Sequence, residues 1–136
     1  MAVEHNIEQS TDFNPKFNEN GLIPVIAQDV QTGDVLMVAY MNRQALDLTI
    51  ETGYATYFSR SRKKLWKKGE ESGHLQKVDQ ILVDCDQDCL LLKVTIDAGQ
   101  CPTGYQSCFY RALKKGDSKK LELVAEKVYS PKKVYK

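Results

Sequence analysis

Short apolar segments joined by brief polar connections set the limits on how this chain can fold. Residues 22–28 (LIPVIAQ) and 35–41 (VLMVAYM) are rich in Val and Ile, and the DVQTGD segment between them supplies turn residues, so the pair predicts a hairpin. Further strand-like segments lie at 54–61, 75–85, 89–97, 108–113 and 121–130, the last two forming a second predicted hairpin. Most connections are too short for helical crossovers, so adjacent strands should be mostly antiparallel.

One segment has the pattern of a helix. Asn42 is placed to cap residues 43–52, and Gly53 is placed to end them. Residues 63–73, rich in Lys and Gly, are expected to be a loop, and the alternation within 89–97 predicts a strand with one buried face. The fold class predicted is mainly β (α+β): a compact two-sheet or barrel-like antiparallel β domain with one main helix.

A chain of 136 residues fits one domain with a sizeable core. We expect a polar N-terminal extension at 1–20, loosely held, and a single domain at 21–136. The sequence has no apolar run of the length that a signal peptide or a membrane span needs, which predicts a soluble cytoplasmic protein. The tail from residue 111 is basic, but aromatics are not interleaved there as on a nucleic-acid surface, so we interpret it as a solvated face.

Three aspartates at alternate positions form the first candidate site. In an extended segment Asp84, Asp86 and Asp88 would share one face, with successive carboxylates roughly 6 to 7 Å apart. Their mutual repulsion would be relieved by a hard cation such as Mg²⁺. An EF-hand is excluded, because Cys89 and Thr95 stand where it needs Gly and Glu. The alternative is a polar turn between two apolar strands.

All four cysteines fall between residues 85 and 108. Thiols stay reduced in the cytoplasm, so the cluster points to a metal or to catalysis before it points to disulfides. Three thiolates with an open position make a catalytic zinc site and four make a structural one. The spacings match no common zinc ribbon, and small buried hydrophobes remain the alternative.

Four ordered segments together resemble the phosphoribosyl-AMP cyclohydrolase family of histidine biosynthesis. They are VLMVAYMNRQAL, TGYATYFSRSRKKLWKKGEESGH, DCDQD and C-x-x-G-x-x-SCFYR. The likeness runs from about residue 21 to residue 111. It implies a hydrolase that opens the adenine ring of its substrate between N1 and C6, in a stand-alone form without the pyrophosphohydrolase domain to which some relatives are fused.

The resemblance also implies two metals and a homodimer with sites shared across the subunit interface. The matching zinc ligands are Cys85, Cys101 and Cys108, and the matching Mg²⁺ ligands are the three aspartates. Two positions depart from the family pattern. Pro102 stands where family members usually carry a His that can exchange a proton. Cys89 is an additional thiol, which we expect to be a small buried side chain.

A substrate with two phosphates needs cations, and these crowd residues 60–68. Arg60 and Arg62 are expected to share a strand face and to bind phosphate in a bidentate manner. Ser59 and Ser61 are the expected hydroxyl donors. For the lysines of this run a solvated loop is the competing interpretation.

Proton transfer needs a group that titrates near neutral pH. His74 is the candidate general acid or base, and Glu70 is expected to hold the imidazole or a water. A structural role for His74 is the alternative. Trp66 is expected either to stack on the purine or to anchor a core or interface.

Two other functions stay open at this point. Loss of the usual histidine at Pro102 would fit a repurposed or inactive relative. A zinc-stabilised module that binds nucleic acid through residues 60–68 would need a closed four-cysteine site and would have no need of the aspartates.

Overall fold

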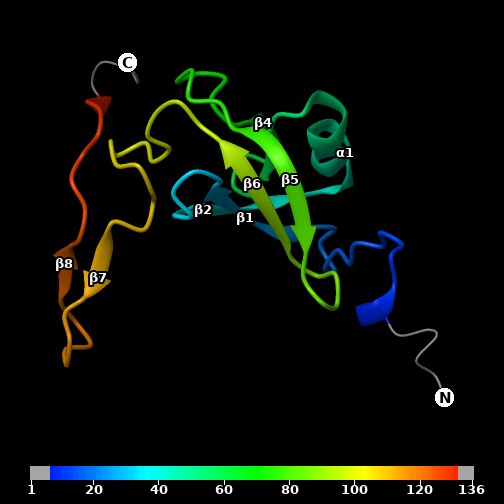
Figure 1. Cartoon of the computed structure of the whole chain (residues 1–136), viewed down its shortest axis with the longest axis horizontal. Helices are drawn as coiled ribbons and strands as arrows, with labels where there is room; N and C mark the ends of the chain where they lie inside the picture. The colour runs from blue at the N-terminus through cyan, green and yellow to red at the C-terminus, as the bar shows by residue number, and fades with distance from the viewer. Residues whose placement is uncertain (1–6, 132–136) are drawn as a thin grey trace.

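The computed structural model describes residues 7–131 and is built around one four-stranded sheet (Figure 1). Its strands follow the spatial order β2-β1-β6-β5, with bounds β1 (Ile23–Asp29), β2 (Val35–Met41), β5 (Lys77–Val83) and β6 (Leu90–Thr95). β1 pairs antiparallel with β2, as does β5 with β6, which confirms the first predicted hairpin. β1 and β6 run parallel, because the long stretch of chain between them allows a crossover.

Alternating side chains of the two central strands build the core. In β1 every second residue is buried, and β6 repeats the pattern with Leu90, Leu92 and Val94 at 0% exposure. The expected buried face of the 89–97 segment is therefore confirmed. Side chains from β2, from the helix α1 (Arg43–Thr52) and from β3 (Thr56–Ser59) complete this core.

The helix α1 (Arg43–Thr52) has the predicted ends. The Asn42 side chain accepts a hydrogen bond from the Ala45 N–H at 2.8 Å, and Gly53 ends the helix with φ of 80° in the left-handed region. Thr49 ties the helix to β3 (Thr56–Ser59), because its hydroxyl accepts from the Thr56 N–H at 3.0 Å and donates to the Thr56 carbonyl at 3.1 Å.

The expected loop at 63–73 is wrong in its first part. β4 (Lys64–Lys67) pairs antiparallel with β3 in a separate two-stranded sheet. The strand forms because Leu65 and Trp66 pack against the core, with the Trp66 ring 5.6 Å from that of Tyr57. The lysines on either side of these two residues hide this apolar pair in the sequence.

The C-terminal hairpin stands apart from the main sheet (Figure 1). β7 (Arg111–Leu113) and β8 (Leu121–Leu123) confirm the second predicted hairpin, although both strands are shorter than expected. A short 3-10 turn, η2 (Ile7–Gln9), begins the described chain. Within residues 7–131 the sheets stay separate and none closes into a barrel, so the mainly β, α+β prediction holds in its multi-sheet form. No helix in this range is long and apolar enough to cross a membrane.

Candidate functional site

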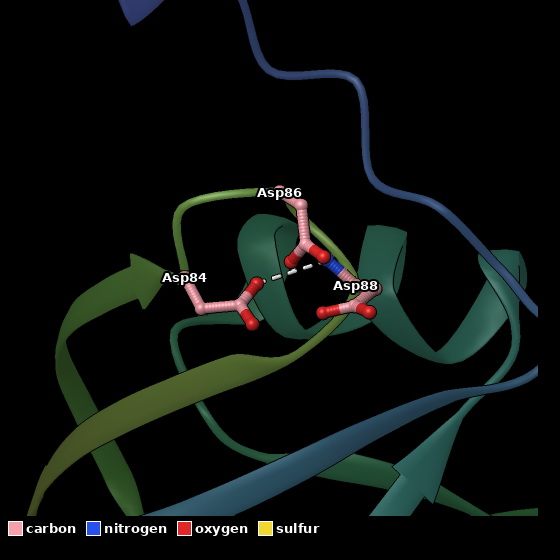
Figure 2. A group of neighbouring side chains, drawn as sticks. All are labelled: Asp84, Asp86 and Asp88. Carbon is pink, nitrogen blue, oxygen red and sulfur yellow. Dashed lines mark hydrogen bonds between the residues drawn. The ribbon is translucent and has the colours of Figure 1, made fainter. Parts of the chain in front are cut away.

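Three carboxylates converge on the turn that joins β5 to β6 (Figure 2). Ligand oxygens of Asp84, Asp86 and Asp88 lie within 4.8 Å of one another. Asp84 Oδ1 accepts hydrogen bonds from the backbone N–H groups of Asp88 at 2.9 Å and Cys89 at 3.2 Å. The expected extended geometry is wrong, because this folded turn, rather than strand alternation, brings the carboxylates together.

Interactions within the turn shift the pKa values of Asp84 and Asp88 in opposite directions. Hydrogen bonds with the side chains of Asp86 and Asp84 raise the pKa of Asp88 to about 6. Desolvation acts to raise the pKa of Asp84, but hydrogen bonds from Asp88 and from the Cys89 N–H outweigh it and hold that pKa below its ordinary value. An all-oxygen donor set under mutual repulsion fits a hard divalent cation such as Mg²⁺.

Gln87 links this turn to the N-terminal stretch. Its backbone is left-handed, with φ of 60°, and its side chain is buried. The side-chain oxygen accepts from the Asn14 N–H at 2.7 Å, and the side-chain amide donates to the Asp12 carbonyl at 3.1 Å. Residues 12–16, expected to be loosely held, are therefore attached to the aspartate turn. The division of the chain at residue 20 stays a prediction.

Cys101 and Cys108 lie together in the loop between β6 and β7. Cys101 is buried. Cys108 is exposed overall, but its thiol is partly shielded from solvent and lies within hydrogen-bond distance of Cys101. Desolvation, followed by the charge and the hydrogen bond of Cys101, raises the pKa of the Cys108 thiol to about 11, against the opposing charge of Lys68. Two adjacent free thiols are donors suited to Zn²⁺.

The turn between β5 and β6, which carries Cys85, and the segment that follows β6, which carries the thiol pair, leave β6 at opposite ends (Figure 1). Cys85 is exposed on the aspartate turn, and the six residues of β6 span about 20 Å. Within residues 7–131 the three aspartates are the one group of three donors close enough to share an ion. The three predicted zinc ligands are thus not brought together within this chain. Cys89, expected to be buried, is half-buried, and its sulfur lies 3.8 Å from the Leu90 carbonyl oxygen.

A buried polar network supports the Cys101 loop from the core side. Lys68 is 3% exposed, and its ammonium donates to the Gln100 carbonyl at 2.8 Å. The Gln100 side-chain oxygen accepts from Gln76 at 3.0 Å, and Gln76 in turn accepts from the Tyr57 hydroxyl at 2.6 Å. Burial lowers the pKa of Lys68, although the neighbouring thiols act in the opposite direction. Lys68 was missed as a site residue, because the sequence does not distinguish it from the solvated lysines beside it.

A cavity of about 440 Å³ opens beside this network. It collects most of the predicted substrate-binding residues: Ser59, Ser61, Arg62 and Trp66, together with Lys64, Lys68, Glu70 and Pro102. Arg60 lies elsewhere, with its guanidinium 4.1 Å from the centre of the Tyr40 ring. The expected shared strand face of Arg60 and Arg62 is wrong, because β3 ends at Ser59 and both arginines fall in the turn before β4.

His74 lies next to the cysteine loop. Its Nδ1 is buried and is the one such side-chain nitrogen or oxygen without a hydrogen-bond partner in residues 7–131. The ring meets Tyr129 edge to face at a centroid distance of 4.7 Å, and the Tyr129 hydroxyl donates to the Cys101 carbonyl. Glu70 lines the cavity but does not partner Nδ1. Gly69 permits this arrangement, because a Cβ there would meet the His74 carbonyl carbon at 2.5 Å.

A cavity bordered by the buried Lys68, with the cysteine loop contributing Pro102 to its lining, is the kind of site at which an enzyme binds a small molecule, here on an α+β fold. Residues 37–110 match the family model described as phosphoribosyl-AMP cyclohydrolase. The chain is 59% identical to a phosphoribosyl-AMP cyclohydrolase of Methanococcoides burtonii over 120 residues, which cover 88% of this chain and 94% of that protein. It is 53% identical to one of Rhodopseudomonas palustris over 134 residues, covering 96% and 89%. The chain belongs to the phosphoribosyl-AMP cyclohydrolase family, a family of hydrolytic enzymes, which confirms the resemblance drawn from the sequence.

Proposed function

We propose that this protein catalyses the hydrolytic opening of the adenine ring of phosphoribosyl-AMP in histidine biosynthesis, in the cytoplasm. The product is the phosphoribosyl-formimino carboxamide ribotide. The observation that carries the proposal is the cavity of about 440 Å³, whose lining combines cations and hydroxyls with Pro102 of the cysteine loop. A cavity of this size is within the range that binds small molecules.

Phosphate recognition is assigned to Arg62, with Ser59 and Ser61 as hydroxyl donors lining the same cavity. Replacing Arg62 with Ala should raise KM by about 10- to 100-fold, the effect of one lost charge-assisted interaction. Arg60→Ala is the matched control, because it removes an equal charge that stacks on Tyr40 outside the cavity wall. Equal effects of the two variants would contradict the assignment.

We propose that Cys85, Cys101 and Cys108 hold Zn²⁺ and that Asp84, Asp86 and Asp88 hold Mg²⁺. When bound, Zn²⁺ supplies Lewis acidity and lowers the pKa of a water, which makes hydrolysis possible near neutral pH. The adjacent thiols and the convergent carboxylates support both assignments.

A homodimer would complete the zinc ligands. Cys85 and Cys101 lie at opposite ends of β6, so Cys85 of a second protomer is needed to meet the thiol pair of the first. The apolar side chains of Leu113, Leu121 and Leu123 on the β7–β8 hairpin are each more than half exposed, at 62%, 53% and 64%. Exposed apolar side chains of this kind favour contact with another protein surface.

Hydrolysis adds water at C6 and breaks the N1–C6 bond, so the water oxygen becomes the carboxamide oxygen and a proton passes to the released nitrogen. We assign this proton transfer to His74, whose Nδ1 is buried without a partner beside the cysteine loop. Glu70, in the cavity wall, can hold the attacking water. Pro102, which also lines the cavity, has no side-chain group that exchanges protons.

The test is the ultraviolet absorbance change when phosphoribosyl-AMP is added to protein loaded with Zn²⁺ and Mg²⁺. We expect turnover that a chelator abolishes and that Asp86→Asn severely reduces. No turnover in folded, metal-loaded protein would overturn the proposal. Recovery of activity by Pro102→His would then identify an inactive relative, whereas nucleic-acid binding that survives Asp86→Asn would identify a binding module.

A further inference from the structure

We infer that Tyr129 is a positioning residue for the active site, and that residues 127–131, here called the C-terminal strap, hold the cysteine loop in its working conformation. The inference rests on the proposed function in taking Cys101 as a metal ligand and His74 as the group that transfers a proton. The strap lies outside residues 37–110, the part of the chain that the family model matches.

The strap is bound along the cysteine loop by backbone contacts. The N–H groups of Val128 and Tyr129 both donate to the Gly104 carbonyl, at 2.8 and 3.2 Å. One residue earlier, Lys127 forms an antiparallel bridge with Tyr105. Two segments more than twenty positions apart in the sequence are therefore paired at the site.

Two glycines of the loop make room for the strap. A Cβ on Gly99 would lie 2.6 Å from Val128 Cγ2 and 3.0 Å from Tyr129 Cδ1. A Cβ on Gly104 would lie 2.7 Å from the Tyr129 carbonyl oxygen. Contacts this close leave no space for a side chain at either position. The loop and the strap therefore pack at this distance only because both positions are glycine.

Tyr129 then joins two parts of the candidate site. Its hydroxyl donates to the Cys101 carbonyl, and its ring meets the His74 ring at 90°. Lys68 binds the carbonyl of the preceding residue, Gln100, from the core. Two consecutive carbonyls of the loop are thus held, one by a buried ammonium and the other by the strap. The sulfur of Cys101 and the imidazole keep their relative position through the Tyr129 side chain.

The test uses Tyr129→Phe, which removes only the hydroxyl, in the full-length protein. We expect iodoacetamide to alkylate Cys101 about 5-fold faster in the metal-free variant, the effect of one lost hydrogen bond on loop opening. Cys89, half-buried beside β6 and not among the proposed zinc ligands, is the internal reference, and peptide mass spectrometry resolves the two sites. Tyr54→Phe is the matched control, since Tyr54 pairs with Lys77 at the edge of the main sheet.

Two further readouts separate positioning from general stability. In the metal-loaded Tyr129→Phe variant we expect faster Zn²⁺ release to a chelator and a lower kcat with KM unchanged, because Tyr129 is not part of the cavity wall. The urea midpoint should stay that of the unsubstituted protein. Unchanged Cys101 alkylation in both Tyr129→Phe and Tyr129→Ala would overturn the inference, as would an equal rise at all four cysteines. Alkylation does not require turnover, so failure of the proposed reaction is distinguishable from failure of this inference.

Discussion

Replacing Tyr57 with Phe removes a single hydroxyl from a network that is closed to water. The Tyr57 hydroxyl donates to the Gln76 side-chain oxygen at 2.6 Å, and both residues are 0% exposed. Burial raises the pKa of Tyr57 well above its ordinary value, so the hydroxyl remains a donor at every working pH. Without this hydroxyl the buried Gln76 oxygen loses its donor, which should lower the free energy of unfolding by about 1–3 kcal/mol.

Equilibrium unfolding in urea measures this loss directly. For a domain of this length the cost corresponds to a fall in Tm of about 4–12 °C. Tyr54→Phe is the control for loss of a tyrosine hydroxyl near the surface and should change the free energy of unfolding by less than about 0.5 kcal/mol. A Tyr57→Phe protein as stable as the unsubstituted one would refute the reasoning.

A double-mutant cycle locates the effect. Gln76→Leu removes the other partner, and the Tyr57→Phe/Gln76→Leu protein should be more stable than the sum of the single changes predicts, by about 0.5–3 kcal/mol. Gln76 also donates to Gln100, which neighbours Cys101, so the same variants should raise Cys101 reactivity. Strict additivity would show that the hydroxyl and the amide do not act together.

Two further predictions concern the aspartate turn and the histidine. Asp88 must lose its proton before a cation binds, and its pKa of about 6 means that Mn²⁺ affinity, followed by electron paramagnetic resonance, should fall as the pH is lowered through that value. About one Asp88 side chain in ten is ionised at pH 5, so Mn²⁺ binding should be about 10-fold weaker than at pH 7. The Asp88→Asn variant should lose this pH dependence. Equal Mn²⁺ affinity of the unsubstituted protein at both pH values would contradict the prediction. Gly69→Ala should cost about 2 kcal/mol or more in unfolding free energy and reduce turnover, because the new methyl group would meet the His74 backbone at 2.5 Å. Gly116→Ala, with similar φ but open space, is its control, and equal losses in the two variants would argue against a specific contact.

Local interactions were predictable from the sequence. The ends of α1 follow from Asn42 and Gly53, whose capping contacts involve only their near neighbours. The two hairpins follow from apolar runs separated by turn residues. The aspartates were predicted to share one face of an extended segment, with a polar turn as the alternative; the structure has the turn, and a left-handed Gln87 within it lets the carboxylates meet.

Features that depend on distant parts of the chain were not predictable. Lys68 is buried only because Gln100 supplies an acceptor more than thirty positions away, and the composition of residues 60–68 does not indicate which cation turns inward. The same limit applies to Tyr129, which contacts Cys101 and His74 although the whole β7–β8 hairpin lies between Cys101 and Tyr129 in the sequence. Apolar periodicity predicts strands and helices, whereas these polar contacts depend on tertiary structure.

The separation of Cys85 from Cys101 leads to a subunit-complementation experiment. If each zinc site takes Cys85 from one protomer and the thiol pair from the other, Cys85→Ser and Cys101→Ser homodimers both lack a ligand at every site. In a heterodimer of the two variants, one site has lost both cysteines and the other has kept all its ligands.

Random assortment of equal amounts places about half of the protomer pairs in heterodimers, each with one intact site of two, so refolding the variants together should restore about a quarter of the unsubstituted activity. Mixing the same proteins without subunit exchange is the control and should restore none. Co-refolded protein that forms heterodimers but stays inactive would show that the three cysteines do not share a site across subunits. In that case a substantial rearrangement within one chain would be required to bring Cys85 along the length of β6 to Cys101.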